Sequence, residues 1–167
     1  SMDAVTRGTS DGLNIYLNIL AILIVLIAFV ALLNGVVGTL PDVAGAPLTL
    51  ERIAGWIFAP IAWLMGIPWA EAQTTGSLLG IKSILNEFIA FLQLADMPAG
   101  ALSEHSRLIT IYAIAGFANL SSIGIQISGI GAMAPERRND LANLGFRALV
   151  AATLAACMNG AIVGIVA

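Results

Sequence analysis

Charged residues are scarce in this 167-residue sequence. Only 10% of the residues are Asp, Glu, Lys or Arg, against about 25% in an average soluble domain, whereas 59% are hydrophobic. So few polar groups do not cover the surface of a soluble globule of this size, and the composition therefore predicts an integral membrane protein. The formal net charge of −3 is too small to indicate a nucleic acid partner.

Cysteine and histidine are almost absent, with Cys157 and His105 as single representatives. One cysteine cannot form a disulfide framework, and a single histidine is too few for a His-based metal site. No nucleophile is paired with a base and no glycine-rich loop follows a strand, so we predict neither an enzyme nor a bound metal or covalent cofactor. The polar start of the chain, with Asp3 and Arg7, indicates a loop or helix end and not a cleaved signal peptide.

Long apolar runs are what the sequence does contain. Residues 11–37 form the first, and at 1.5 Å per residue they cross the roughly 30 Å hydrocarbon core as a transmembrane span. Residues 48–66 are too short, and too interrupted by Pro60, to span. Because tryptophan favours the membrane–water interface, we predict an interfacial helix here, with a short buried helix as the alternative. The three tryptophans fall in or just after this segment, at Trp56, Trp63 and Trp69.

Residues 69–97 carry polar and charged groups in the middle of an apolar stretch. As one continuous span they would place Lys82, Asn86 and Glu87 near the bilayer centre, where each charge costs about 3 kcal/mol even on lenient insertion scales. A re-entrant helical hairpin that turns within residues 80–87 and leaves on the side it entered avoids this cost. We predict this hairpin, with its polar tip buried against a cavity, and keep the continuous span as the alternative.

Residues 107–134 are long enough to span, but their centre is polar and rich in glycine. Glycine costs roughly 1 kcal/mol per residue in a helix, and a broken backbone inside lipid requires cover from protein or from a water-filled cavity. A broken transmembrane helix of this kind is typical of a transporter binding site. The polar residues and glycines of this centre are Gly116, Asn119, Ser121, Ser122, Gly124, Gln126, Ser128, Gly129 and Gly131, of which Gln126 and Ser128 are more typical of packing.

Residues 136–167 form the last predicted transmembrane helix. Arg137, Arg138 and Arg147 place its start in the cytoplasm by the positive-inside rule. The broken span then runs inward, the hairpin enters from outside, and the first span runs outward. Small residues recur along the last helix and predict a close-packing face. They are Ala148, Ala151, Ala152, Ala155, Ala156, Gly160 and Gly164.

Glu87 is the strongest candidate for a binding residue, because an ionisable residue inside a membrane segment is a functional hypothesis by default. A buried carboxylate needs hydrogen-bond donors to offset lost hydration, and substrate hydroxyls supply them. A purely structural pair with Lys82 is the alternative. Asn119 and Ser122, three residues apart, offer donors and acceptors that suit a neutral polyol such as a sugar, with interhelical hydrogen bonding as the alternative.

Several motifs together carry a family likeness that covers nearly the whole chain. They are Pro60-Ile-Ala-Trp-Leu-Met-Gly66, Leu85-Asn-Glu-Phe88, Gly116-Phe-Ala-Asn-Leu-Ser-Ser-Ile-Gly-Ile-Gln126 and Met133-Ala-Pro-Glu-Arg-Arg138. Combined, they resemble the C-terminal half of a concentrative nucleoside transporter. The resemblance implies a secondary symporter that moves nucleosides inward with sodium or protons, is built from two inverted repeats and assembles as a homotrimer.

The resemblance also implies roles for individual residues. Glu87, Asn119 and Ser122 would bind the ribose of uridine or a similar nucleoside. Phe117 would belong to a hydrophobic barrier, and we expect Asn86, Ser121 and Lys82 to support the site.

The likeness covers the scaffold span and the second repeat. The first repeat, with the ligands of the coupling ion, has no counterpart here. We therefore expect the ribose-binding half of a transporter of the bacterial inner membrane, with a membrane packing module that has no transport activity as the alternative.

Overall fold

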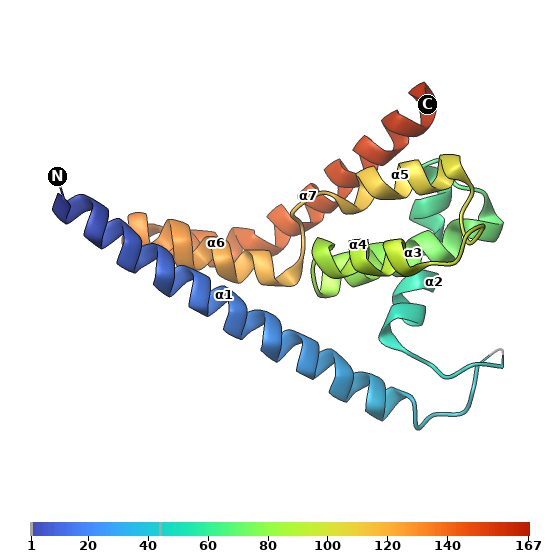
Figure 1. Ribbon diagram of the computed structural model, residues 1–167, viewed down its shortest axis with the longest axis horizontal. Helices are drawn as coiled ribbons and strands as arrows, with labels where there is room; N and C mark the ends of the chain where they lie inside the picture. Colours follow the sequence, from blue (N-terminus) through green and yellow to red (C-terminus); the bar gives the residue numbers. More distant parts are fainter. Residues whose placement is uncertain (1, 44) are drawn as a thin grey trace.

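The computed structural model describes residues 2–43 and 45–167, and in this part of the chain it contains helices and no strand (Figure 1). The predicted all-α class is confirmed. In chain order the helices are α1 (Met2–Val37), α2 (Leu50–Leu64), α3 (Trp69–Ile84), α4 (Glu87–Asp96), α5 (Glu104–Ile114), α6 (Leu120–Met133), the 3₁₀ turn η1 (Pro135–Arg137) and α7 (Arg138–Val166).

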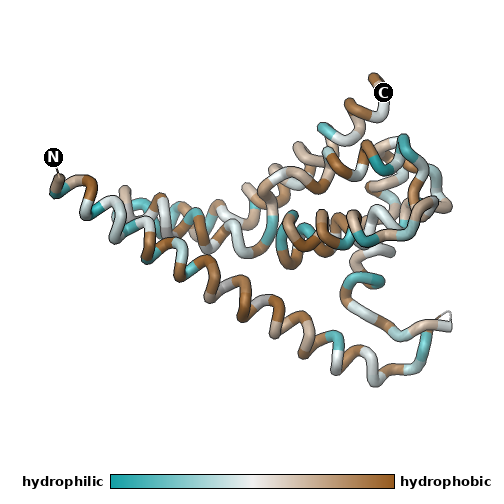
Figure 2. Tube along the Cα trace, viewed as in Figure 1, coloured by the Kyte–Doolittle hydropathy of each residue, from teal (hydrophilic) through white to brown (hydrophobic). Residues whose placement is uncertain are grey.

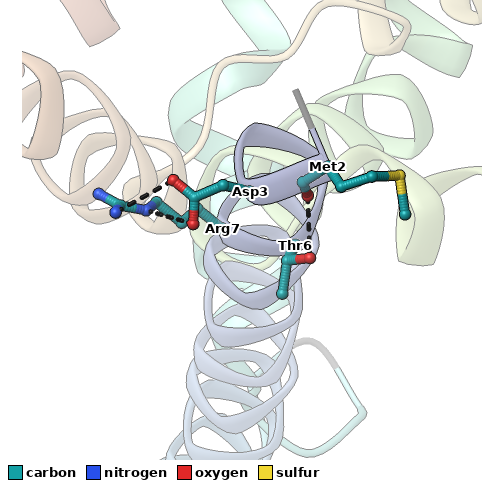
Figure 3. A network of polar contacts seen from close by, with 4 residues as sticks. All are labelled: Met2, Asp3, Thr6 and Arg7. Atoms are coloured by element: carbon teal, nitrogen blue, oxygen red, sulfur yellow. Dashed lines mark hydrogen bonds and ion pairs between the residues drawn. The ribbon is translucent and has the colours of Figure 1, made fainter.

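Helix α1 begins earlier than residues 11–37, the span expected from hydropathy, and of the two alternatives for the segment around Asp3 and Arg7 it forms a helix end and not a loop. Arg7 pairs with Asp3 one turn before it, and the Thr6 hydroxyl donates to the carbonyl of Met2 (Figure 3). These local contacts extend the helix through the polar start. Its 36 residues measure about 54 Å, more than a hydrocarbon core needs. Figure 2 shows that its apolar stretch lies in the later part.

Two helical segments in the described chain, α1 and Pro135–Val166, are long and apolar enough to cross a membrane. Helices α2 and α3 pass the same test together, but the chain bends by 120° between them. Gly66 lies in this bend with φ of 98°, a left-handed conformation that glycine adopts without strain. The fold therefore combines long spans with short helices that do not cross on their own.

Helix α2 has a small-residue face and an aromatic face. Ala54, Gly55 and Ala59 are buried, and the glycine packs against α3, where a Cβ on Gly55 would lie 3.2 Å from the Gln73 carbonyl oxygen. Trp56 and Trp63 stay exposed, at 41% and 55%. The outward tryptophans agree with the predicted interfacial helix, while the alternative of a buried helix holds for one face only.

Helices α3 and α4 form a hairpin, as their close positions in Figure 1 show. Its base is closed because Glu71, in the first turn of α3, accepts hydrogen bonds from the amide and the hydroxyl of Ser103, which follows α4. The turn is tighter than predicted: α3 stays helical to Ile84, and only Leu85 and Asn86 separate it from α4. Entry of this hairpin into the membrane and return on the same side remains a prediction.

The predicted broken span consists of α5 and α6, and together they run antiparallel to α7 (Figure 1). The start of α5 shares a hollow with Ala167 at the end of α7. At the other end, a Cβ on Gly131 would lie 2.8 Å from Cγ of Arg138. The break covers residues 115–119, shorter than the predicted stretch, because residues 120–133 are helical in spite of their glycines.

The packing face predicted on α7 is only partly right. Ala156 and Gly160 are buried, and a Cβ on Gly160 would lie 2.9 Å from the carbonyl oxygen of Ile109 in α5. The alanines at 148, 151, 152 and 155 remain exposed in this chain. Close backbone approach therefore fixes α5, the first half of the broken span, against α7.

The core lies where α2, α3, α5 and α7 meet. Leu78, Leu79 and Ile109 have no exposed surface, and the hydroxyls of Thr75 and Thr110 lie 2.9 Å apart between α3 and α5. A polar pair inside this apolar layer ties the hairpin to the broken span. The tip of the hairpin is thereby held beside the break.

Candidate functional site

The candidate site lies where the amino-terminal ends of α4 and α6 meet. Glu87 is the first residue of α4, and Asn119 is the residue that caps α6. Asn119 donates from Nδ2 to Oε2 of Glu87 over 3.0 Å. The hairpin tip and the break, predicted separately from the sequence, are therefore in direct contact.

Asn119 is held by a capping box that fixes its orientation. Its Oδ1 accepts hydrogen bonds from the Ser122 amide at 2.8 Å and from the Ser121 hydroxyl at 2.6 Å. The Ser122 hydroxyl in turn donates to the Asn119 carbonyl oxygen at 2.6 Å. Because Oδ1 accepts these two donors, Nδ2 is directed to the Glu87 carboxylate.

Glu87 lies at the positive end of a helix dipole. It lies in the first turn of α4, and helix amino-terminal ends carry a positive partial charge that stabilises anions. Asn86 caps the same helix through a 2.9 Å bond from the Ile89 amide to its side chain. Glu87 is only partly buried, and within the described residues protein hydrogen bonds reach Oε2 alone. Its second oxygen is therefore available to a ligand.

Phe117 and Ser122 line a small pocket between the break and α7, of about 120 Å³. Phe117 is 53% exposed, whereas Ser122 is buried. Gln126 lies one turn further along and lines the same pocket. The side chain of Ser128 lies outside the described residues. A pocket of this size is below the roughly 300 Å³ of a typical small-molecule site and does not hold such a ligand by itself.

A larger hollow of about 610 Å³ lies between α1 and α6 and is lined mainly by apolar side chains, among them Ile15, Ile125 and Ile130. It is open and does not include Glu87, Asn119 or Ser122. This hollow is therefore separate from the cluster of Glu87, Asn119 and Ser122.

Lys82 does not pair with Glu87 in this structure, so the structural ion pair considered from the sequence is not formed. Its side chain is fully buried, and its Nζ has no hydrogen-bond partner within the described residues. The Nζ lies beside Gly116, 3.7 Å from the place a Cβ would take. Sequence reasoning missed the role of Gly116, where a Cβ would also lie 2.8 Å from Cβ of Ala156 in α7.

Comparison with known proteins gives a consistent result. Residues 1–164 match the family model described as the Na⁺ dependent nucleoside transporter C-terminus. An uncharacterized transporter, YutK, of Bacillus subtilis is 43% identical over 98% of this chain and 40% of its own length. The nucleoside permease NupC of Helicobacter pylori is 36% identical over 99% of this chain and 41% of its own length.

A solved structure has the same fold. The structure of CNTnw in an inward-facing substrate-bound state superposes with a TM-score of 0.82 at 40% identity, over 98% of this chain and 40% of that one. The chain thus spans about 40% of the length of the first relatives it matches.

Proposed function

This chain belongs to the family of Na⁺-dependent nucleoside transporters, whose C-terminal part it matches, and we propose that it supplies the ribose-binding half of a cation-coupled nucleoside symporter. The family is one of membrane transporters, so the chain is part of a multi-pass membrane protein and not of an enzyme. The bacterial inner membrane is its proposed location.

The observation that carries the proposal is the meeting of Glu87 and Asn119 at two helix amino-terminal ends. A carboxylate with one open oxygen accepts hydrogen bonds from hydroxyl groups, and the vicinal hydroxyls of ribose offer two donors. Partial burial removes some of the hydration of the Glu87 carboxylate, and a ligand that donates hydrogen bonds to the carboxylate offsets this loss.

The neighbouring residues take supporting roles in this proposal. Asn119 shares its Nδ2 between Glu87 and the ribose, while Ser121 and Ser122 keep its side chain in position. Phe117, exposed in the break, covers the site as a hydrophobic barrier. Asn86 holds the first turn of α4, and with it the position of Glu87.

The remaining walls of the site come from parts of the transporter outside this chain. The pocket beside Ser122 is too small for a nucleoside, and we propose that a first repeat completes it and holds the coupling ion, sodium or a proton. Movement of the hairpin-bearing part against the scaffold then changes access to the bound nucleoside. We further propose that the transporter is a homotrimer.

The test is uridine binding by the complete transporter in detergent, measured for the wild type, Glu87→Gln and Glu104→Gln. Glu104 is the matched control because it also lies in the first turn of a helix, α5, but is exposed. We expect Glu87→Gln to weaken binding at least tenfold, about 1.4 kcal/mol, and Glu104→Gln to leave it unchanged. Equal binding by all three proteins would remove Glu87 from the site.

Two further arms make the experiment specific for ribose. In the wild type, 2′- or 3′-deoxyuridine should bind more weakly than uridine, and Glu87→Gln should lose most of this discrimination, because the acceptor of the hydroxyl is gone. The isolated 167-residue chain, measured in parallel, should not bind. The alternative, a packing module without transport activity, predicts that alanine at Glu87, Asn119 and Ser122 leaves uridine binding by the complete protein intact.

A further inference from the structure

Lys82 carries a buried ammonium group, and no direct partner in the described part of the chain replaces the hydration that this group loses. It has no exposed surface, and within the described residues no hydrogen bond or ion pair reaches its Nζ. An ammonium removed from water in this way costs several kcal/mol unless neighbouring charges or dipoles replace the lost hydration. The surroundings of the Nζ therefore have to supply that compensation.

The break of the transmembrane helix lies next to this ammonium. A Cβ built on Gly116 would lie 3.7 Å from the Lys82 Nζ. Gly116 directly follows Ala115, the residue that caps the carboxyl-terminal end of α5. The last carbonyls of a helix have no partner within it and carry a negative partial charge of about half an electron. The Glu87 carboxylate and the Cys157 thiol also lie within range of the Lys82 charge. The end of α5 and Glu87 thus favour a positive charge at this place and oppose the effect of desolvation, which is the largest influence on the ammonium.

The position of the Nζ also restricts which groups can stabilise its charge. This chain alone covers Lys82 completely. No other segment of the transporter can touch the ammonium unless the hairpin first moves away from α5 and α7. The compensating groups in this state are consequently those of this chain, and the lysine behaves as a permanent occupant of the space beside the break.

We propose that the Lys82 ammonium takes the place of a small monovalent cation at the carboxyl-terminal end of α5, so that this half of the transporter carries its own fixed cation beside Glu87. In transporters with broken helices, half-helix carboxyl-terminal ends and unwound carbonyls coordinate the coupling ion. Here a tethered ammonium lies beside such a helix end, although no carbonyl oxygen of the described residues hydrogen-bonds to it, and the ribose site in this half then needs no inorganic ion of its own. The inference rests on the proposed function only for the identity of the neighbouring ligand.

If the lysine side chain is removed, a cation from solution should take the place of its ammonium group. Lys82→Ala leaves a space beside the α5 carbonyls and Glu87 that ammonium, methylammonium, sodium or lithium can enter and choline is too large to enter. Lys82→Met fills the same space without a charge and leaves no room for an ion. Ser83→Ala is the matched control, because Ser83 also has a buried side-chain oxygen without a partner within the described residues but carries no charge.

The first readout is the unfolding temperature of the complete transporter in each of these chloride salts at constant ionic strength, with choline as reference. An ion site elsewhere in the transporter contributes equally to all four proteins, so the quantity of interest is the difference from wild type. We expect Lys82→Ala to gain at least about 3 °C more from a small cation than the wild type gains. Lys82→Met and Ser83→Ala should show no additional gain.

The second readout is uridine affinity, which should fall at least tenfold for Lys82→Ala in choline and recover at least threefold in ammonium. An unfolding temperature of Lys82→Ala that responds to cations as the wild type does would overturn the proposal. So would aggregation of Lys82→Ala even when it is purified in ammonium or methylammonium, since the proposal predicts that these ions restore the fold. Because the first readout uses no nucleoside, it stands even if Glu87→Gln shows that the ribose proposal is wrong.

Discussion

At the scale of single residues, some polar atoms of the break cap the start of α6, whereas another contacts the hairpin. The hydroxyls of Ser121 and Ser122 donate to Asn119. The Asn119 Oδ1 accepts from the Ser121 hydroxyl and from the Ser122 amide. Hydrogen bonding between helices, the alternative weighed from the sequence for Asn119, is present as the bond from Nδ2 to Glu87, while Oδ1 caps the residue's own helix. Substrate binding by Asn119 stays a prediction. The cap leaves Nδ2, which donates to Glu87, for the proposed contact with a substrate.

This division can be tested at Asn119. Serine caps a helix about as well as asparagine, but its short side chain does not reach Glu87, whereas alanine loses the cap at a cost of about 1 kcal/mol. We expect Asn119→Ser to keep the unfolding temperature within about 3 °C of the wild type and to bind uridine at least tenfold more weakly. Asn119→Ala should lose both stability and binding. Wild-type affinity in Asn119→Ser would assign the residue to capping alone.

At the scale of helices, the glycines of this chain are of two kinds: some have open space around them, and others allow two helix backbones to approach closely. Gly124 has no atom within 4 Å of a built Cβ, and α6 forms through it. Gly76 instead lies where the backbones of α2 and α3 meet, and a Cβ there would lie 2.5 Å from the Gly55 carbonyl oxygen and 2.8 Å from the Ala59 amide nitrogen. The sequence pattern drew attention to the first kind, while the second kind fixes the helix pair.

The two glycines form a matched pair for mutation. Gly76→Ala should lower the stability of the complete protein by about 1 to 3 kcal/mol, because backbone atoms cannot move aside as a flexible side chain can. Gly124→Ala should be neutral or stabilising, since alanine favours a helix by up to about 1 kcal/mol over glycine. Thermal unfolding in detergent, with the monodisperse fraction after heating, measures both. An equal response of the two variants would contradict the close packing of α2 on α3.

At the scale of the whole molecule, the directions of the helices agree with the topology predicted from the arginines. The end of α7 lies beside the start of α5, and the start of α1 lies beside the end of α6, where Asp11 and Met133 line one hollow. In the predicted topology the first pair of ends lies outside and the second inside. The side of the membrane on which each pair lies remains a prediction.

Labelling of single cysteines measures this topology. In a Cys157→Ser background, Asn139→Cys at the start of α7 should react with a membrane-impermeant maleimide only after the cells are permeabilised. Asp42→Cys, in the exposed connection between α1 and α2, should react in intact cells. Both positions are exposed, so access to the reagent depends on the side of the membrane and not on burial. The reverse pattern would invert the predicted orientation.

The residues of the candidate site could largely be selected from the sequence because their chemistry is unusual in lipid. A carboxylate at Glu87 and the polar group around Asn119 stand out against apolar neighbours, and their expense in a membrane is a property of the residues themselves. Their direct hydrogen bond could not be predicted, because 32 positions separate them and only the fold of the hairpin against the break brings them together. The same holds for Lys82, which the sequence suggested as the partner of Glu87 and the structure places beside Gly116.

By itself, the sequence determined the class of the protein, its long spans, the existence of a hairpin and a break, and the candidate polar residues, because hydropathy and residue chemistry are local. Tertiary structure alone decided where the break begins and ends, since contact of Gly116 with α7 and the cap at Asn119 outweigh the glycines that follow. It also decided which partner each polar group takes. Partner choice depends on distances between helices, and those distances are set at glycines where backbones touch.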